Sequence, residues 1–244
     1  MVPRFFCPPS RSLSLAEDRV MRLPAEQAHH ARQVLRLADG AQVVLFDGEG
    51  GEYAAQLKFE GRDVAVAIGQ HMADDRMPPL TIHIVQGLAV GDKMDWVVQK
   101  GSEIGVVGVT PVAAERSVLK LVGDRAAKRV SHWQQVAVAS AEQCGRNRVL
   151  QVGEIRTLAV TLSEPFEGER WILDPDAGER LSALPAPTGP VAILIGPEGG
   201  WSPAELAAAH AAGCRRVLMG PRVLRTETAG LAVAAAMLGR WGDY

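Results

Sequence analysis

Short runs of apolar and β-branched residues, separated by glycine turns, characterise the first 72 residues. Gln42–Phe46 predicts a strand, and the glycine-rich segment 47–51 predicts a hairpin turn, because glycine adopts positive φ without strain. Glu52–Phe59 and Asp63–Ile68 predict neighbouring strands. One helix is expected to start with Pro24 at its first position, and its apolar face to consist of Ala28, Ala31, Val34 and Leu35. Residues 1–72 therefore predict a small barrel-like module with a single helix.

The pattern changes after the polar, proline-containing segment 73–79, and we place a domain boundary there. Beyond it, apolar runs predict strands at 80–85, 109–112, 170–173, 191–195 and 216–219. These strands alternate with predicted helices at 92–103, 124–142, 203–212 and 227–240. Such alternation favours an α/β domain over 80–244, built on a largely parallel sheet.

Composition narrows the class of protein. With 244 residues, 47% of them hydrophobic, and a net charge of −2, the chain is expected to be globular rather than disordered. No apolar run approaches the roughly 18 residues that a membrane-spanning helix requires. We expect no secretory signal, and three cysteines without a CxxC pair favour a reducing, cytoplasmic location. The six histidines form no metal-binding pattern, so we expect no metal.

The positive charge is unevenly distributed. Residues 1–36 contain six arginines against three acidic residues, and residues 115–148 contain seven basic residues against three acidic ones. Arginine outnumbers lysine 21 to 5 in the whole chain. A GC-rich genome is one explanation of this bias; recognition of phosphate by the guanidinium group is the other.

The segment 191–206 carries the strongest local signal. A continuous apolar strand ends at Gly196, and Ser202 with Glu205 forms a predicted capping box for the following helix. Ligands of open α/β sheets bind beyond the carboxyl ends of the strands, and Gly199 and Gly200 would let the backbone approach such a ligand closely. The loop matches neither the Walker pattern nor GxGxxG, which disfavours a nucleotide-dependent enzyme. A plain strand-to-helix turn is the alternative.

A second strand, loop and helix follow at 217–230. Thr226 is a predicted helix cap, and Glu227 in the first helical turn complements the helix dipole. Arg225, beside a candidate ligand loop, suggests a role in orientation and proton handling, unless it is simply a surface arginine next to a cap.

Several motifs together carry a resemblance to one family. LeuIleGlyProGluGlyGly at 194–200 and LeuMetGlyProArgValLeuArgThrGluThrAla at 218–229 resemble the C-terminal signature of the RsmE family. The segments 91–105, 115–118 and 133–146 are similar to its early helix, next loop and central helix. In the N-terminal module, the matching residues are His30, Val34, Leu35, Arg36 and Phe46-Asp47-Gly48. The family's members are bacterial small-subunit rRNA uridine methyltransferases of the SPOUT class.

The resemblance implies an N-terminal PUA-like RNA-binding β-barrel over 1–72, a linker over 73–79 and a SPOUT methyltransferase domain with a trefoil knot over 80–244. It also implies a homodimer that uses S-adenosyl-L-methionine to methylate nitrogen 3 of a uridine in 16S rRNA, within an assembled 30S-type subunit. Two positions depart from the family pattern. Gln33 stands where many relatives carry arginine, and Gly101 replaces a more usual alanine.

Three sets of candidate site residues follow from the motifs and the resemblance. The catalytic candidates are Arg225, Glu227 and Glu198. The cofactor-binding candidates are Leu194, Gly196, Pro197, Gly199, Gly200, Leu218, Met219, Gly220, Leu224 and Thr226. The RNA-binding candidates are Arg4, Arg11, Arg22, Arg32, Arg36, Arg116, Lys120, Arg125 and Arg129. Two rival interpretations remain: a SPOUT enzyme that methylates another base or a ribose hydroxyl, and a non-enzymatic RNA-binding protein.

Overall fold

The computed structural model describes residues 2–9, 19–61 and 63–244, which form two compact units. The chain passes from the first unit to the second between Met77 and Pro78, within the segment 73–79. Residues 141–149 belong to the first unit, although the sequence placed them in the second domain. The physical reason is long-range bonding: Glu142 Oε1 accepts a hydrogen bond of 2.9 Å from the amide of Phe6, and Asn147 bonds to Arg4.

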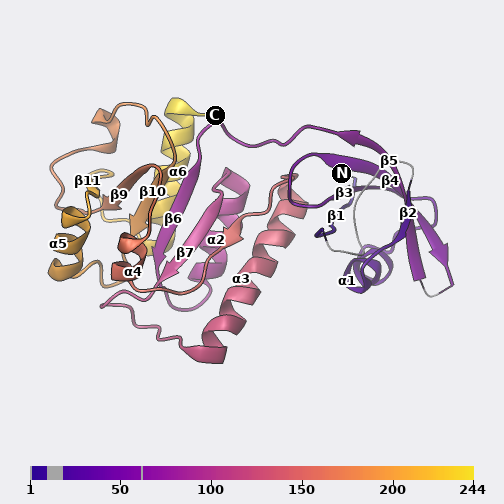
Figure 1. Ribbon diagram of the computed structural model, residues 1–244, viewed down its shortest axis with the longest axis horizontal. Coiled ribbons are helices and arrows are strands. Elements are labelled where there is room, and N and C mark those ends of the chain that lie inside the picture. Colours follow the sequence, from indigo (N-terminus) through magenta and orange to yellow (C-terminus); the bar gives the residue numbers. More distant parts are fainter. Residues whose placement is uncertain (1, 10–18, 62) are drawn as a thin grey trace. The chain divides into compact units, whose positions relative to one another are not determined.

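The first unit is built on a five-stranded sheet (Figure 1). Its strands, in spatial order, are β1 (Arg4–Phe6), β3 (Gln42–Phe46), β4 (Glu52–Glu60), β5 (Asp63–Met72) and β2 (Val20–Arg22). β1 pairs parallel to β3, and the other neighbours are antiparallel. The strands predicted at 42–46, 52–59 and 63–68 are confirmed; β1 and β2 were not predicted, because three residues are too few to show a period.

The helix of the first unit differs from its prediction. Helix α1 (Ala25–His29) begins after Pro24, which is the N-cap rather than the first helical residue, and continues as a π-helix (His30–Val34). The amide of Leu35 bonds to the carbonyl oxygen of His30, five residues earlier. The wider π turn rotates the next residues, so Ala31 is buried while Val34 and Leu35 are exposed. The predicted common face is therefore wrong for Val34 and Leu35.

The second unit contains a six-stranded sheet in which all pairs are parallel. In spatial order its strands are β11 (Arg215–Val217), β9 (Glu169–Leu173), β10 (Val191–Ile195), β6 (Ile82–Gly87), β7 (Gly108–Val112) and β8 (Gln151–Val152). Every residue of β10 is buried, as expected for a central strand covered on both faces. The predicted α/β architecture with a parallel sheet is confirmed, and the two-residue β8 was not predicted.

Helices cover both faces of this sheet. Alternate residues of β10 face α4 (Leu158–Ser163) and α5 (Pro203–Ala211) through a shared core. On the other face, Gly230 of α6 (Thr226–Trp241) packs on Ile195 and Ile84, and α6 also contacts α2 (Lys93–Ile104). The longest helix is α3 (Gly123–Cys144), and a short 3-10 turn spans Leu181–Ala183. No helix within the described ranges is long and apolar enough to cross a membrane.

Candidate functional site

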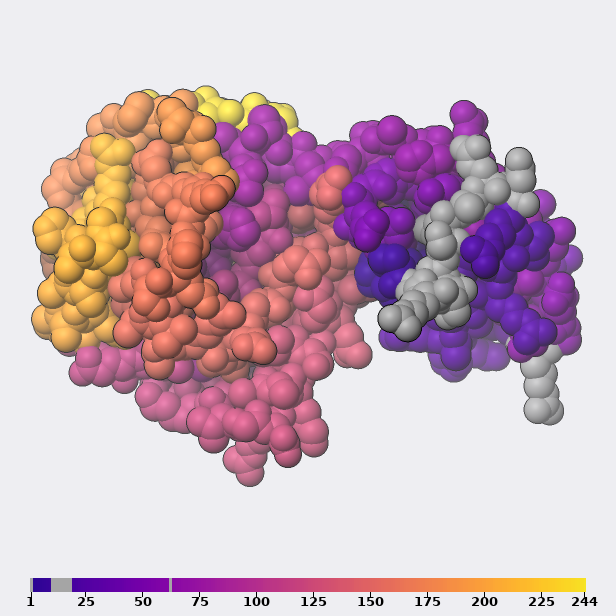
Figure 2. Space-filling model, viewed as in Figure 1, coloured from indigo at the N-terminus to yellow at the C-terminus, as the bar shows by residue number. Residues whose placement is uncertain are grey.

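A cavity of about 690 Å³ opens at the carboxyl edge of the parallel sheet, where β9, β10 and β11 end side by side. Residues from β10 onward, orange to yellow in Figure 2, gather in this part of the second unit. The loops after these three strands supply most of the lining, so the cavity lies where open α/β sheets bind their ligands. Its volume suits a small organic ligand.

The two glycine-proline loops predicted from the sequence both line the cavity. Of the cofactor-binding candidates, the lining includes Gly196, Pro197, Gly199, Gly200, Leu218, Met219, Gly220, Leu224 and Thr226. Leu194 is the exception, because its side chain is buried in the core under α4 and α5. β11 ends at Val217, earlier than predicted, which leaves Leu218 and Met219 free to line the cavity.

The loop after β10 comes very close to β6. A Cβ atom on Gly87, at the end of β6, would lie 2.5 Å from the nitrogen of Pro197. Only glycine therefore permits this approach of loop and strand. At the far end of the loop the predicted capping box is confirmed: Ser202 Oγ accepts from the amide of Glu205, and the amide of Ser202 donates to Glu205 Oε2.

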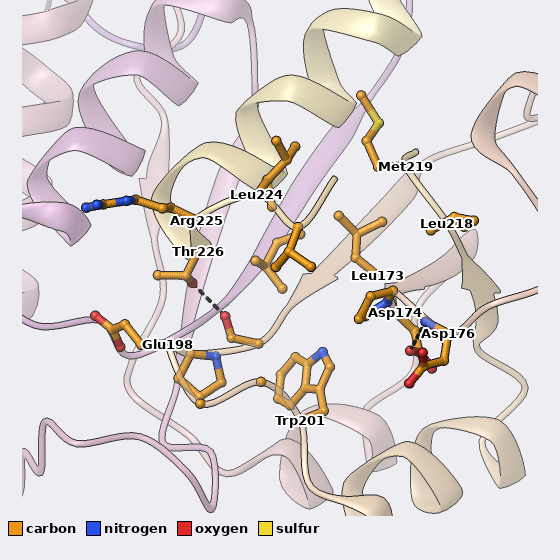
Figure 3. A pocket seen from close by; sticks show the side chains of 18 of the residues that line it. Leu173, Asp174, Asp176, Glu198, Trp201, Leu218, Met219, Leu224, Arg225 and Thr226 are labelled. Carbon is orange, nitrogen blue, oxygen red and sulfur yellow. Dashed lines mark hydrogen bonds between the residues drawn. The ribbon is translucent and has the colours of Figure 1, made fainter. Parts of the chain in front are cut away.

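Thr226 does not cap α6, contrary to the prediction. The N-cap is Arg225, without a side-chain cap, and Thr226 is the first helical residue. The hydroxyl of Thr226 instead donates to the carbonyl oxygen of Gly196 at 2.6 Å and accepts from Gln86 Nε2 at 2.7 Å. Gln86 is fully buried at the end of β6, so a relay of two hydrogen bonds joins β6, the loop after β10 and α6. Figure 3 shows the second of these bonds, from Thr226 to the loop after β10.

The cavity has an end where apolar side chains gather, here called the apolar end, and a charged end. Figure 3 shows Leu173, Leu218 and Met219 at the apolar end, with Asp174 and Asp176 beside them, and Glu198 with Arg225 on the other side. Arg225 is exposed and lines the cavity, and no hydrogen bond or ion pair joins its guanidinium to another described residue. The arrangement can therefore accommodate an apolar ligand group at one end and a group that carries or develops charge at the other.

Lys93, on the first turn of α2, lies at the charged end between two carboxylates. Its Nζ is 2.8 Å from Glu198 Oε1 and 3.8 Å from Glu227 Oε2. Glu198 Oε1 also accepts a hydrogen bond of 3.0 Å from the amide of Val90. Burial by itself would raise the pKa of Glu198, but the hydrogen bonds from Lys93 and from backbone amides outweigh it, so the pKa is lowered. Glu198 is consequently a weak proton acceptor.

Sequence reasoning missed several residues of the cavity. β9 contributes its last residue, Leu173, and the loop after it contributes Asp174, Pro175 and Asp176. Other elements contribute Lys93 and Trp201. Asp174 is buried and pairs with Arg216 at 2.5 Å, which fixes this loop beside β11. The sequence contains a pattern that indicates this third loop: a proline and a glycine follow the predicted strand 170–173, as they follow the strands before the other two loops.

The structure gives several RNA-binding candidates partners within the protein. Arg4 forms a buried ion pair of 2.5 Å with Glu52, so its prediction as an RNA contact is wrong. Arg116 donates to the carbonyl oxygens of Gly199 and Trp201, and therefore holds the loop after β10. Arg32 donates to the carbonyl oxygens of Gly61 and Asp63 and lies over the ring of Phe59.

The other RNA-binding candidates fall into three groups. Arg22 and Arg32 line a hollow of about 360 Å³ in the first unit, together with His29 and Gln33. Arg36 of the first unit and Lys120 and Arg125 of the second are exposed, and Arg129 is half-buried. Arg11 lies outside the described residues.

Comparison with known proteins decides the family. A family model described as "RNA methyltransferase domain" matches residues 76–238, and one described as "RNA methyltransferase PUA domain" matches residues 23–67. The ribosomal RNA small subunit methyltransferase E of Neisseria gonorrhoeae, solved bound to S-adenosyl methionine, is 36% identical. That comparison covers 100% of this chain and 99% of the other, with a TM-score of 0.93. The chain belongs to the RsmE family of RNA methyltransferases.

Curated members of the RsmE family match over nearly the full length as well. The ribosomal RNA small subunit methyltransferase E of Bacillus subtilis is 29% identical over 234 residues, which cover 91% of each chain. The residues matched by the RNA methyltransferase PUA model, 23–67, lie within the first unit and include β3 and β4.

Proposed function

We propose that this chain transfers a methyl group from S-adenosyl-L-methionine to nitrogen 3 of a specific uridine in 16S rRNA. The observation that carries the proposal is the cavity at the ends of β9, β10 and β11, with its apolar end and its charged end. The Neisseria relative was solved with S-adenosyl methionine, and it matches this chain from end to end.

The residues of the cavity fit such a cofactor. An adenosine group needs an apolar slot and hydrogen bonds from groups that carry no charge. Leu173, Leu218, Met219 and Leu224 would form the slot, and a Cβ on Gly220 would meet no atom within 4 Å, so backbone is open to the ligand there. The indole nitrogen of Trp201 is buried without a hydrogen-bond acceptor among the described residues, which leaves it a spare donor in the wall.

The charged end fits the acceptor. When bound, the cofactor supplies a methyl group on a sulfonium centre, an electrophile that requires in-line alignment with the accepting nitrogen. Nitrogen 3 of uracil still carries its proton, so a base must remove it and a donor must stabilise the charge that develops on the adjacent carbonyl oxygens. In this proposal Arg225 stabilises that charge, since its guanidinium is free of any described partner. Glu227 or Glu198 helps to position the cofactor or the proton.

In this proposal, exposed basic residues bind the RNA backbone. Arg22, Arg36, Lys120 and Arg125 are exposed and available for phosphate contacts, and the target base must leave its stack to reach the cavity. We propose a homodimer with a trefoil knot in the methyltransferase domain, which acts in the cytoplasm on rRNA within an assembled 30S-type subunit.

The decisive experiment is a methylation assay with purified protein and radiolabelled S-adenosyl-L-methionine. The substrates are 30S subunits and naked rRNA from a strain that lacks the enzyme, and the product is mapped by mass spectrometry. We expect one N3-methyluridine, formed faster on subunits than on naked rRNA. A methyl group on another base or on a ribose would replace the proposed acceptor, and absence of cofactor binding would identify a non-enzymatic RNA-binding protein.

A further inference from the structure

The charged end of the cavity brings together three side chains from three separate elements. Lys93 comes from the start of α2, Glu198 from the loop after β10, and Glu227 from the first turn of α6. All three are largely shielded from solvent, with side-chain exposures of 26%, 27% and 16%. Two carboxylates that share one ammonium group in a partly desolvated site must influence each other's ionisation.

The two carboxylates differ in the hydrogen bonds that their oxygens accept. Glu198 Oε1 is bonded twice, by the ammonium of Lys93 and by the amide of Val90. Glu227 Oε2 is buried and has no hydrogen-bond partner among the described residues, and the ammonium lies 3.8 Å away, beyond hydrogen-bond distance. A carboxylate oxygen without a donor is the better proton acceptor, because hydrogen bonds to the charged form weaken its basicity.

We propose that Lys93 is a positioning residue: Glu198 anchors its ammonium beside Glu227, and Glu227 is the acceptor of the uracil proton. This inference rests on the proposed function. In the step, the N3–H bond breaks and its proton passes to the Glu227 carboxylate as the bond from N3 to the methyl carbon forms. The bond from that carbon to sulfur breaks, and the sulfonium becomes a neutral thioether. The proton on Glu227 is then released to solvent.

Most other charged groups around Lys93, Glu198 and Glu227 have partners elsewhere or are exposed. Asp95 of α2 is held by His132 and by Trp133, and Asp92 is exposed at the N-cap of the same helix. Arg116 is bonded to loop carbonyl oxygens, and Asp174 is paired with Arg216. The remaining charged residues of the cavity lining are Asp176, Arg222 and Arg225. Of all these groups, only Lys93 is within ion-pair distance of both glutamates.

Removal of the ammonium should therefore raise the pKa of Glu198, because this carboxylate would lose its hydrogen bond from Lys93 and the positive charge beside it in a partly buried site. For Lys93→Met we expect the acid limb of the kcat profile to move to higher pH and turnover at neutral pH to fall at least about tenfold. Lys93→Arg should restore most of the turnover at neutral pH and most of the wild-type position of the acid limb. In both variants the cofactor affinity measured by calorimetry should stay within about threefold of wild type. Lys100→Met, which removes a lysine that pairs with Glu103 further along α2, is the matched control.

A second readout does not depend on activity. In cofactor-free protein with 13C-labelled glutamate carboxyl groups, Lys93→Met should shift the NMR titration of the Glu198 signal to higher pH, with Glu198→Gln used for assignment. Glu227→Gln should lower kcat by about 10²–10⁴, the range for loss of a general base, and Glu198→Gln by less. An unchanged Glu198 titration in Lys93→Met, or a larger loss in Glu198→Gln than in Glu227→Gln, would overturn the inference. If the wild-type enzyme methylates no RNA, the proposed function fails, whatever the titrations show.

Discussion

Thr226 donates a hydrogen bond of 2.6 Å to the carbonyl oxygen of Gly196, and this bond joins the first residue of α6 to the loop after β10. The hydroxyl is buried and also accepts from Gln86, so its loss would remove this donor from the carbonyl oxygen of Gly196 and leave Gln86 Nε2 only its bond to the carbonyl oxygen of Gly87. Since these loops form two walls of the cavity, we regard Thr226 as the residue that holds them together.

Thr226→Val tests this arrangement. Valine keeps the shape but removes the hydroxyl, and groups left unsatisfied in a buried site cost about 1–3 kcal/mol. We expect the affinity for S-adenosyl-L-methionine, measured by calorimetry, to fall roughly tenfold or more. Thr226→Ser keeps the hydroxyl and should bind nearly as wild type does. Equal affinities for the valine and serine variants would mean that the relay does not shape the cavity.

A side chain at Gly220 should block the cavity without affecting the fold. A Cβ there meets no atom within 4 Å, so Gly220→Val adds bulk only to the space that lines the cavity. Cofactor binding should be abolished in a protein whose thermal unfolding is unchanged. Gly199→Val should have the same effect on binding through a different cause, because its Cβ would lie 3.0 Å from Arg116 Cβ. Gly239→Ala, on α6 with open space around it, is the control.

Arg225→Ala should impair turnover rather than cofactor binding. Loss of one donor that stabilises developing charge typically lowers kcat by about 10²–10³. The side chain of Arg225 makes no described hydrogen bond or ion pair that would support the loop, so the calorimetric affinity for the cofactor should be unchanged. Turnover close to wild type in Arg225→Ala would remove this residue from the catalytic role.

The first unit should lose stability in acid because of Glu52. Burial by itself would raise the pKa of Glu52, but the ion pairs with Arg4 and Arg76 outweigh it, so the pKa is lowered. The pKa of Glu52 is lower in the folded protein than in the unfolded chain. Its contribution to the free energy of unfolding is therefore complete above roughly pH 5 and is lost as the pH falls through the folded-state pKa. Urea unfolding between pH 3 and pH 7 should show this loss in wild type and a weaker one in Glu52→Gln. At neutral pH, Arg4→Ala should cost about 3–5 kcal/mol, because it leaves a buried carboxylate with less compensation.

RNA binding should weaken with salt in proportion to the phosphates that the exposed basic residues neutralise. The expected slope of log K against log salt concentration is about −0.7 to −0.9 for each phosphate. Alanine at Arg36 or Arg125, both exposed, should reduce the slope by about one such unit. Arg4→Lys, a conservative substitution of a residue that is buried in an ion pair, should leave the salt slope unchanged. A flat salt response in wild type would contradict the proposed RNA surface.

Local sequence patterns were sufficient for much of the architecture and for the backbone of the site. The apolar run at 191–195, the capping box of Ser202 and Glu205, and the glycine-proline turns all depend on neighbours within a few residues. Parallel strands place their carboxyl ends at one edge, so two loops that follow such strands could be assigned to one cavity before any coordinates were known.

Tertiary structure alone decided the partners of the polar side chains. Gln86 and Thr226 are 140 residues apart, Lys93 and Glu198 are 105 apart, and Arg4 and Glu52 are 48 apart. No helical or strand period links residues at such separations, because they meet only through the order in which strands join the sheets and helices cover them. The sequence by itself therefore determined the elements, the two loops and the family of this protein, whereas strand order and packing determined which charges face each other in the cavity and which arginines are buried.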